Sequence, residues 1–338
     1  MGLDVNFSKV KYKDIAALVG LDRFGNPEDI ETFELHRSRI PTLFRFIIED
    51  MDPMLMQYGH LSDHITEEAT SRFMSPVWFR FALHCEKLTL SLQILNHLIA
   101  QFGFKFRNLP ESIIKGRLPT RGRMQYYFRA FGRISILVVE AKFEIRNIPA
   151  RFDTIAQVIA ECDGQFFSFF FLRSGCLFIY FVTACDWNNS MNNFGLPVFG
   201  ILWGGVAVQF FKYDGTMKAY PFFRGAFSGD PLPLQNGIVL PDSALAESTL
   251  PFILTMRQIS ETVFDSLLRG YIASPEAYRD GPATTANRRG SLDKWDEALE
   301  SARCALSRFR DAESKRQRSD KAGASQAVLQ AQEALNHR

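Results

Sequence analysis

Cysteine is scarce in this sequence and follows no pattern. The five cysteines are Cys85, Cys162, Cys176, Cys185 and Cys304. Their number is odd and no two of them form a C-x-x-C pair, so neither a disulfide framework nor a zinc site is predicted. We therefore expect a reducing, intracellular environment, nuclear or cytoplasmic.

An excess of charge and the common enzyme signatures are also lacking. The 338 residues contain 39 Lys and Arg against 37 Asp and Glu, which leaves a net charge of +2 and no global field for nucleic acid. Met1 to Lys13 is polar, without the apolar stretch of a signal peptide. The sequence has no P-loop, G-x-S-x-G or dinucleotide motif, and its six histidines show no metal-ligand spacing. No small-molecule cofactor is expected.

The sequence does contain enough apolar residues, 46%, to form a hydrophobic core, and Phe is unusually frequent at 32 positions. Their periodicity predicts an α/β fold, a small mixed β-sheet flanked by helices. The expected organisation is a helical N-terminal extension at 1–61, a core at 62–272, a linker at 273–290, and a C-terminal helix with a polar tail at 291–338. Expected strands are 121–132, 134–142, 197–204 and 206–213, and expected helices are 77–104, 151–163, 249–272 and 292–312.

The segment Ile134 to Lys142, ISILVVEAK, is predicted to be a buried strand. Glu140 and Lys142 are two residues apart, so they point to the same side of that strand. A carboxylate and an ammonium at the end of a buried strand are costly unless they are paired or bind something. Two interpretations follow: a salt bridge at a strand end, or a functional site.

Three further polar residues accompany this strand in a suggestive order. Glu68 lies near the start of a predicted helix, Gln125 in the preceding strand, and Gln157 in the following helix. Two of them also have a structural explanation. Glu68 is suited to the first turn of its helix, where the dipole favours an acid. Gln157 and Glu161 are one turn apart and could form a solvated helix face.

Together these segments resemble the PD-(D/E)xK nuclease-like superfamily, specifically its diverged fungal members and an uncharacterised fungal family with this core. The motifs are EAT, GRMQY, VVEAK, AQVIAECD and PVFGILWGG, within residues 62–272. The resemblance implies a restriction-endonuclease-like core, DNA as the partner, and a mobile-element origin.

The chemistry that this resemblance implies is hydrolysis of a DNA phosphodiester with Mg²⁺ or Mn²⁺. Carboxylates at strand ends hold the metal, which offsets phosphate charge and lowers the pKa of a bound water. Glu140 is then a metal ligand and Lys142 the catalytic lysine that orients the water. Glu68 binds a second metal or its water, Gln125 occupies the remaining ligand position, and Gln157 steadies the site from the helix.

The sequence departs from the superfamily at one position, since Gln125 stands where the pattern has aspartate. An amide oxygen can ligate Mg²⁺, but the negative charge is lost. Three alternatives follow: a weakened site, replacement of the missing carboxylate by Glu144 or Asp153, or a non-cleaving module that binds nucleic acid or protein.

The segment Gln165 to Thr183 does not fit the surrounding pattern. It contains seven Phe and has neither helical nor strand periodicity. A transmembrane helix is one interpretation, which would make the protein membrane-associated, but Arg173 would place a charge in mid-span. A core insertion is a second interpretation. We favour a third, an unspliced intron translated in frame, and expect no genuine membrane span.

The codons that this sequence permits are compatible with the intron. A GGT codon for Gly164 supplies a GT donor, and ACA for Thr183 followed by the first base of Ala184 supplies an AG acceptor. Splicing there would join the flanks as AECDACDWNN, with alanine restored. A genomic sequence without GT and AG at these points would refute the hypothesis.

Overall fold

The computed structural model describes part of the chain. The described residues are 5–6, 9–25, 29–41, 44–45, 47–49, 56, 106–108, 113–116, 120–123, 126–130, 134–142, 148–162, 164–167, 181–183, 196–204, 207–214, 217, 222–227, 237–239, 250–280 and 289–336. For the strands between 106 and 142 the description covers the backbone and its pairing.

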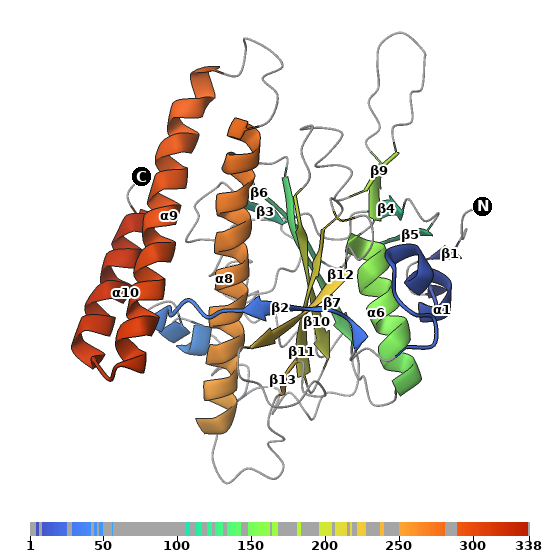
Figure 1. Cartoon of the computed structure of the whole chain (residues 1–338), viewed down its shortest axis with the longest axis horizontal. Coiled ribbons are helices and arrows are strands. Elements are labelled where there is room, and N and C mark those ends of the chain that lie inside the picture. Colours follow the sequence, from blue (N-terminus) through green and yellow to red (C-terminus); the bar gives the residue numbers. More distant parts are fainter. Residues whose placement is uncertain are drawn as a thin grey trace.

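A mixed sheet forms the centre of the described structure (Figure 1). Its order is β2-β12-β11-β10-β7-β6-β3, with β13 paired to β11. The strands are β2 (Thr32–Leu35), β3 (Phe106–Asn108), β6 (Tyr126–Ala130), β7 (Ile134–Lys142), β10 (Val198–Gly204), β11 (Ala207–Tyr213), β12 (Phe222–Phe227) and β13 (Gly237–Val239). β7 pairs in parallel with β10, and β2 with β12, while the other pairs are antiparallel. The expected α/β class is confirmed.

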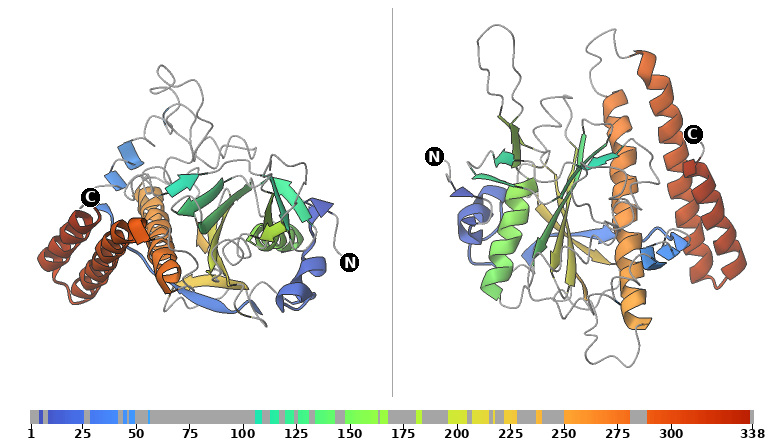
Figure 2. Two further views of the ribbon diagram at one scale, coloured as in Figure 1. Left: turned by 90° about the horizontal axis from the view of Figure 1, so that it is seen from above. Right: turned by 180° about the vertical axis from the view of Figure 1, so that it is seen from behind.

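Helices cover both faces of this sheet. α6 (Ile148–Cys162) lies on one face and α8 (Leu250–Asp280) on the other, as Figure 2 shows from above. α9 (Arg289–Gln317) and α10 (Lys321–Asn336) form a further layer outside α8. The short α1 (Tyr12–Ile15) and η2 (Ala16–Val19) lie against the outer side of α6.

A second sheet lies beside α6 and has the order β1-β5-β4-β8-β9. Its strands are β1 (Val5–Asn6), β4 (Ile113–Gly116), β5 (Thr120–Arg123), β8 (Gly164–Phe167) and β9 (Phe181–Thr183). The ends of the Phe-rich segment pair here, Gln165 with Thr183, while 168–180 lie outside the described residues. No described strand of the central sheet belongs to 165–183, so β7, α6 and β10 are complete without that segment.

The predicted helical periodicities are confirmed where side chains are described. In α6, Ile155, Val158, Ile159 and Cys162 are all buried. They pack with α1, η2, β10, β11 and β12 into one hydrophobic cluster, while a second cluster fills the space between the sheet, α8 and α9. The interior therefore consists of two apolar layers, one on each face of the sheet.

α8 is buried around most of its circumference because it lies between the sheet and α9. The predicted stripe is present, with Met256, Ile259, Val263 and Leu267 buried. The buried hydroxyls bond to carbonyls one turn earlier: Ser260 to Met256, Thr262 to Gln258, Ser266 to Thr262 and Ser274 to Gly270. These four buried hydroxyls are thus satisfied within the helix itself.

One buried carboxylate ties three segments together. Asp265 of α8 is 2% exposed and accepts hydrogen bonds from Ser38 Oγ at 2.8 Å and Arg310 Nη2 at 2.7 Å. Arg269 Nε is 2.8 Å from its second oxygen. Removing one partner of such a buried group leaves charge uncompensated, which costs several kcal/mol. Asp265 therefore fixes α9 and the segment after β2 to α8.

The C-terminal tail differs from the sequence expectation of a polar, marginal segment after the last predicted helix. α9 runs to Gln317 and α10 follows, with Ala327 and Ala331 buried against α9. Between the helices Ser319 has φ 64°, and the N–H groups of Ser319 and Asp320 donate to Arg316 and Lys315. This is a Schellman motif. Small alanines on one stripe of a polar helix were too weak a signal to predict the contact.

Four other expectations also differ. The expected strand 121–132 is two strands, β5 in the second sheet and β6 in the central sheet. The N-terminal extension is not purely helical, because residues 32–35 form β2 and pair with β12. The linker is shorter than expected, because α8 continues to Asp280. Residues 222–227, FFRGAF, form the strand β12, which the sequence did not predict because its apolar residues do not alternate with polar ones. In each case contacts with residues distant in the sequence decide the local structure.

At Gly200 of β10 the helix α6 packs closely on the sheet. A Cβ at this position would lie 2.9 Å from Val158 Cγ1 and 3.2 Å from Cys162 Sγ. Both neighbours are buried side chains on the helix, so neither can move into solvent. Only glycine allows the helix to pack at this distance.

We predict that Gly200→Val lowers the free energy of unfolding by about 1 to 3 kcal/mol, because the added methyl groups overpack this contact. Urea unfolding followed by circular dichroism measures the change. Ala226→Val on β12 is the control, at a partly exposed strand position, and should stay within about 0.5 kcal/mol of the parent. A Gly200→Val variant as stable as the parent would contradict this account of the packing.

Candidate functional site

The predicted E-x-K pair lies at the carboxyl end of β7. Glu140 pairs with Leu202 of β10 and Lys142 with Gly204, the last residue of that strand. β7 and β10 are parallel neighbours, and α6 is the helix that connects them along the chain. Since α6 begins six residues after Lys142, its first turn lies at the edge where β7 ends. This edge is where open α/β sheets usually bind ligands.

Gln157 is buried on α6, so the structure excludes the solvated helix face as its role. It is only 6% exposed. The helix contacts both β7 and β10, the two strands that end at Lys142 and Gly204. Val158 and Cys162 are the α6 side chains that approach β10 at Gly200, whereas Gln157 shares the helix face of Asp153, one turn away. The role of Gln157 at the strand end therefore stays a prediction.

Two further buried polar residues, Gln209 and Arg224, lie on the face of the sheet that α6 covers. The sequence did not predict them. Leu202 pairs with both Glu140 and Gln209, so these three positions form one row across β7, β10 and β11, with about 10 Å between the outer two strands. Gln209 is 7% exposed. Arg224 on β12 is 2% exposed and pairs with Phe211, which packs in the cluster beneath α6.

Gln209 is unusual because its Oε1 is buried and accepts no hydrogen bond within the described part of the chain. An unsatisfied buried carbonyl costs about 1 to 3 kcal/mol. Gln209 shares its row with Glu140. A buried polar group that lowers stability in this way is typical of a functional position. The sequence signal was a single polar residue among apolar neighbours in VAVQFFKY, which has a meaning only once the register is known.

The remaining predicted residues are not brought together by the described structure. Glu68, Gln125 and Glu144 lie outside the described residues. Asp153, the other proposed replacement carboxylate, accepts from Lys11 Nζ at 2.6 Å and from the Tyr12 backbone N–H at 3.4 Å. Asp153 therefore faces the N-terminal segment. Among the described side chains, no three His, Cys, Asp or Glu form a group that could hold a metal.

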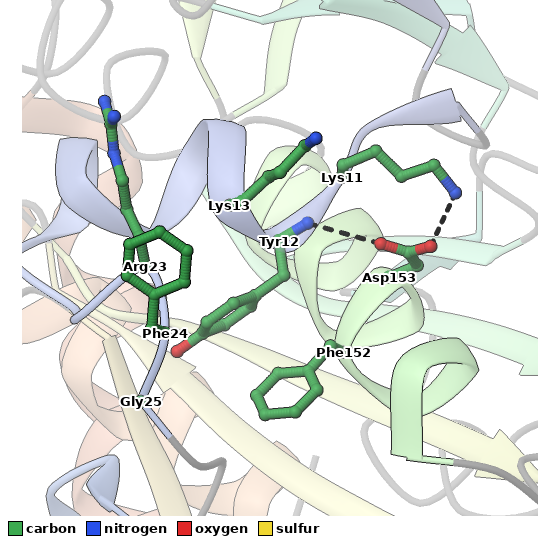
Figure 3. Close-up of a pocket in the computed structure, with 8 residues that line it drawn as sticks. All are labelled: Lys11, Tyr12, Lys13, Arg23, Phe24, Gly25, Phe152 and Asp153. Atoms are coloured by element: carbon green, nitrogen blue, oxygen red, sulfur yellow. Dashed lines mark hydrogen bonds and ion pairs between the residues drawn. The ribbon is translucent and has the colours of Figure 1, made fainter.

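A pocket of about 380 Å³ lies where the N-terminal segment meets α6 (Figure 3). It is lined by Lys11, Tyr12, Lys13, Arg23, Phe24, Gly25, Phe152 and Asp153. The Tyr12 and Phe152 rings are 4.7 Å apart at a tilt of 51°. Burial raises the pKa of the Tyr12 hydroxyl to about 12, and the carboxylates of Asp22 and Asp29 add to the shift. The hydroxyl is therefore a neutral donor at physiological pH.

The fold places the chain in the α/β class. Its mixed sheet lies between helices, and Glu140 and Lys142 are at the carboxyl end of β7, beside its parallel neighbour β10. No protein-family model, curated protein or solved structure matches the chain. None of the helices in the described ranges is both long and apolar enough to cross a bilayer.

We predict that Gln209→Leu leaves the free energy of unfolding unchanged or raises it by about 1 kcal/mol, because the substitution removes a buried carbonyl without a partner. Chemical unfolding of the purified chain measures this. Gln326→Leu, at an exposed position of α10, is the control and should change stability by less than about 0.5 kcal/mol. A loss above about 2 kcal/mol for Gln209→Leu would show that the packing depends on this amide.

Proposed function

We propose that this protein is a metal-dependent nuclease that hydrolyses DNA phosphodiester bonds, with its site at the carboxyl ends of β7 and β10. The observation that supports the proposal most strongly is the position of the E-x-K pair. Glu140 and Lys142 occupy the end of a central strand, next to a parallel neighbour and beside the first turn of α6. On this proposal the central sheet is a restriction-endonuclease-like core.

The arrangement suits a phosphodiester in two ways. Mg²⁺ and Mn²⁺ prefer carboxylate oxygens, which Glu140 supplies at the strand end. The first turn of α6 lies at the same edge, and backbone N–H groups of a helix N-terminus favour a phosphate. A strand end with a carboxylate and an ammonium therefore has both a metal ligand and a cation for the charge that develops in the reaction.

Each residue has a proposed role in hydrolysis. Glu140 holds Mg²⁺, which lowers the pKa of a bound water and offsets charge on the scissile phosphate. Lys142 orients that water and stabilises the developing negative charge. Gln157 steadies the site from α6. Glu68 and Gln125 complete the ligand set, as the resemblance to the PD-(D/E)xK superfamily implies.

Cleavage of plasmid and single-stranded DNA with Mg²⁺ or Mn²⁺ tests the proposal. We expect cleavage by the parent chain and a loss of at least about 100-fold in Lys142→Ala, because the developing charge loses its cation. Lys321→Ala, an exposed lysine on α10, is the charge-matched control and should retain full activity.

The same assay is run on a form with residues 165–184 removed and Gly164 changed to alanine, which the intron hypothesis predicts to be the mature chain. Equal activity of Lys142→Ala and its parent would refute the assignment of the E-x-K pair. Absence of cleavage by both forms, when folded, would favour a module that binds nucleic acid or protein without cutting it.

The departure at position 125 gives a second test. We predict that Gln125→Asp tightens Mg²⁺ binding, because it restores a negative charge to the ligand set. Calorimetric titration measures the affinity, and Gln326→Asp on the exposed face of α10 controls for added charge. An unchanged affinity would exclude residue 125 from the metal site.

A further inference from the structure

We propose that the pocket between the N-terminal segment and α6 binds single-stranded DNA, with a base stacked on Phe24 and the adjoining phosphate held by Lys13 and Arg23. The pocket is the one that Tyr12, Phe24 and Phe152 line with aromatic rings. The inference goes beyond the proposed cleavage, because binding here needs neither a metal nor the E-x-K pair.

The first observation is the position of Phe24. Its side chain is 91% exposed, although burying a phenylalanine is worth about 1.5 to 3 kcal/mol. The surrounding turn holds it outward: the Phe24 N–H donates to Asp22 Oδ1 at 2.9 Å, and the Gly25 N–H donates to the Asp22 carbonyl at 3.3 Å. Bases of single-stranded DNA stack on exposed aromatic rings of this kind.

The second observation is the charge at the rim. Of the three cations that line the pocket, Lys11 is paired with Asp153 at 2.6 Å. Lys13 and Arg23 are exposed and form no ion pair with any described residue. They lie on the same N-terminal segment as Phe24, and Figure 3 shows both reaching outward from it. Two cations without an ion-pair partner among the described residues, on the same segment as an exposed ring, suit a phosphate followed by a base.

The third observation concerns the acidic residues near the pocket, which decide where the phosphate of the ligand lies. Burial raises the pKa of Tyr12 and the carboxylates of Asp22 and Asp29 add to the shift; Asp22 Cβ would lie 3.0 Å from a Cβ on Gly25. Asp29 Oδ2 would also be 3.3 Å from a Cβ on Gly25. These acids repel a phosphate from the Gly25 side of the pocket. The phosphate is therefore placed at Lys13 and Arg23, and the neutral base over the rings.

The pocket also lies near the proposed cleavage edge. Phe152 and Asp153 are in the second turn of α6, the helix whose first turn follows β7. Gln157 is four residues further along the same helix, one turn away. A DNA strand bound at the pocket thus contacts the helix that also carries a residue of the candidate site.

Fluorescence anisotropy of the full chain with a labelled single-stranded oligonucleotide, in EDTA so that no cleavage occurs, tests the inference. We expect Phe24→Ala to weaken binding by about five- to 150-fold, the range for loss of one base stack, and Phe24→Trp to retain it. Arg23→Ala should weaken binding and reduce the slope of log affinity against log salt by about 0.7, the value for one phosphate contact on a single strand. Lys321→Ala should change neither.

Three results would overturn the inference: no binding by the parent chain, equal binding by Phe24→Ala and its parent, or tighter binding of a duplex of the same sequence. Circular dichroism confirms that each variant is folded, which the exposure of Phe24 and Arg23 leads us to expect. Failure here with cleavage retained removes only this site. Binding retained without cleavage removes only the proposed nuclease activity.

Discussion

The close packing of α6 on β10 at Gly200 is the constraint on which the rest of the structure depends. Because no Cβ is present there, the helix lies directly against the strand, and its residues Val158 and Cys162 fill the space. This contact holds α6 over the parallel pair β7 and β10. It also sets the first turn of the helix at the edge where Lys142 ends β7.

The elements that could be predicted from the sequence are those whose apolar period is strong by itself. ISILVVEAK gave β7, and the spacing of Ile155, Val158 and Ile159 gave α6. The elements that could not be predicted depend on partners far away in the chain. β2 is a strand because β12 lies beside it, and α10 packs through alanines such as Ala327, whose small side chains give little periodic signal.

The candidate site divides in the same way. The E-x-K pair could be predicted from one strand, since the spacing of two along β7 is local. Gln209 and Arg224 could not, because a polar residue in a strand is informative only when the register shows which row it joins. The register of Leu202 with both Glu140 and Gln209 is set by pairing across three strands. The sequence pattern therefore predicted the E-x-K pair at the end of β7, and the pairing of the strands showed that Gln209 shares the row of Glu140.

The central claim is that a divalent metal binds at the carboxyl end of β7. Anomalous diffraction from crystals soaked in Mn²⁺ tests it most directly, because Mn²⁺ accepts the same oxygen ligands as Mg²⁺ and scatters anomalously. The account predicts a peak about 2.0 to 2.2 Å from a carboxylate oxygen of Glu140. A peak bound elsewhere, or no peak at saturating Mn²⁺ with Glu140 paired instead to Lys142, would contradict it.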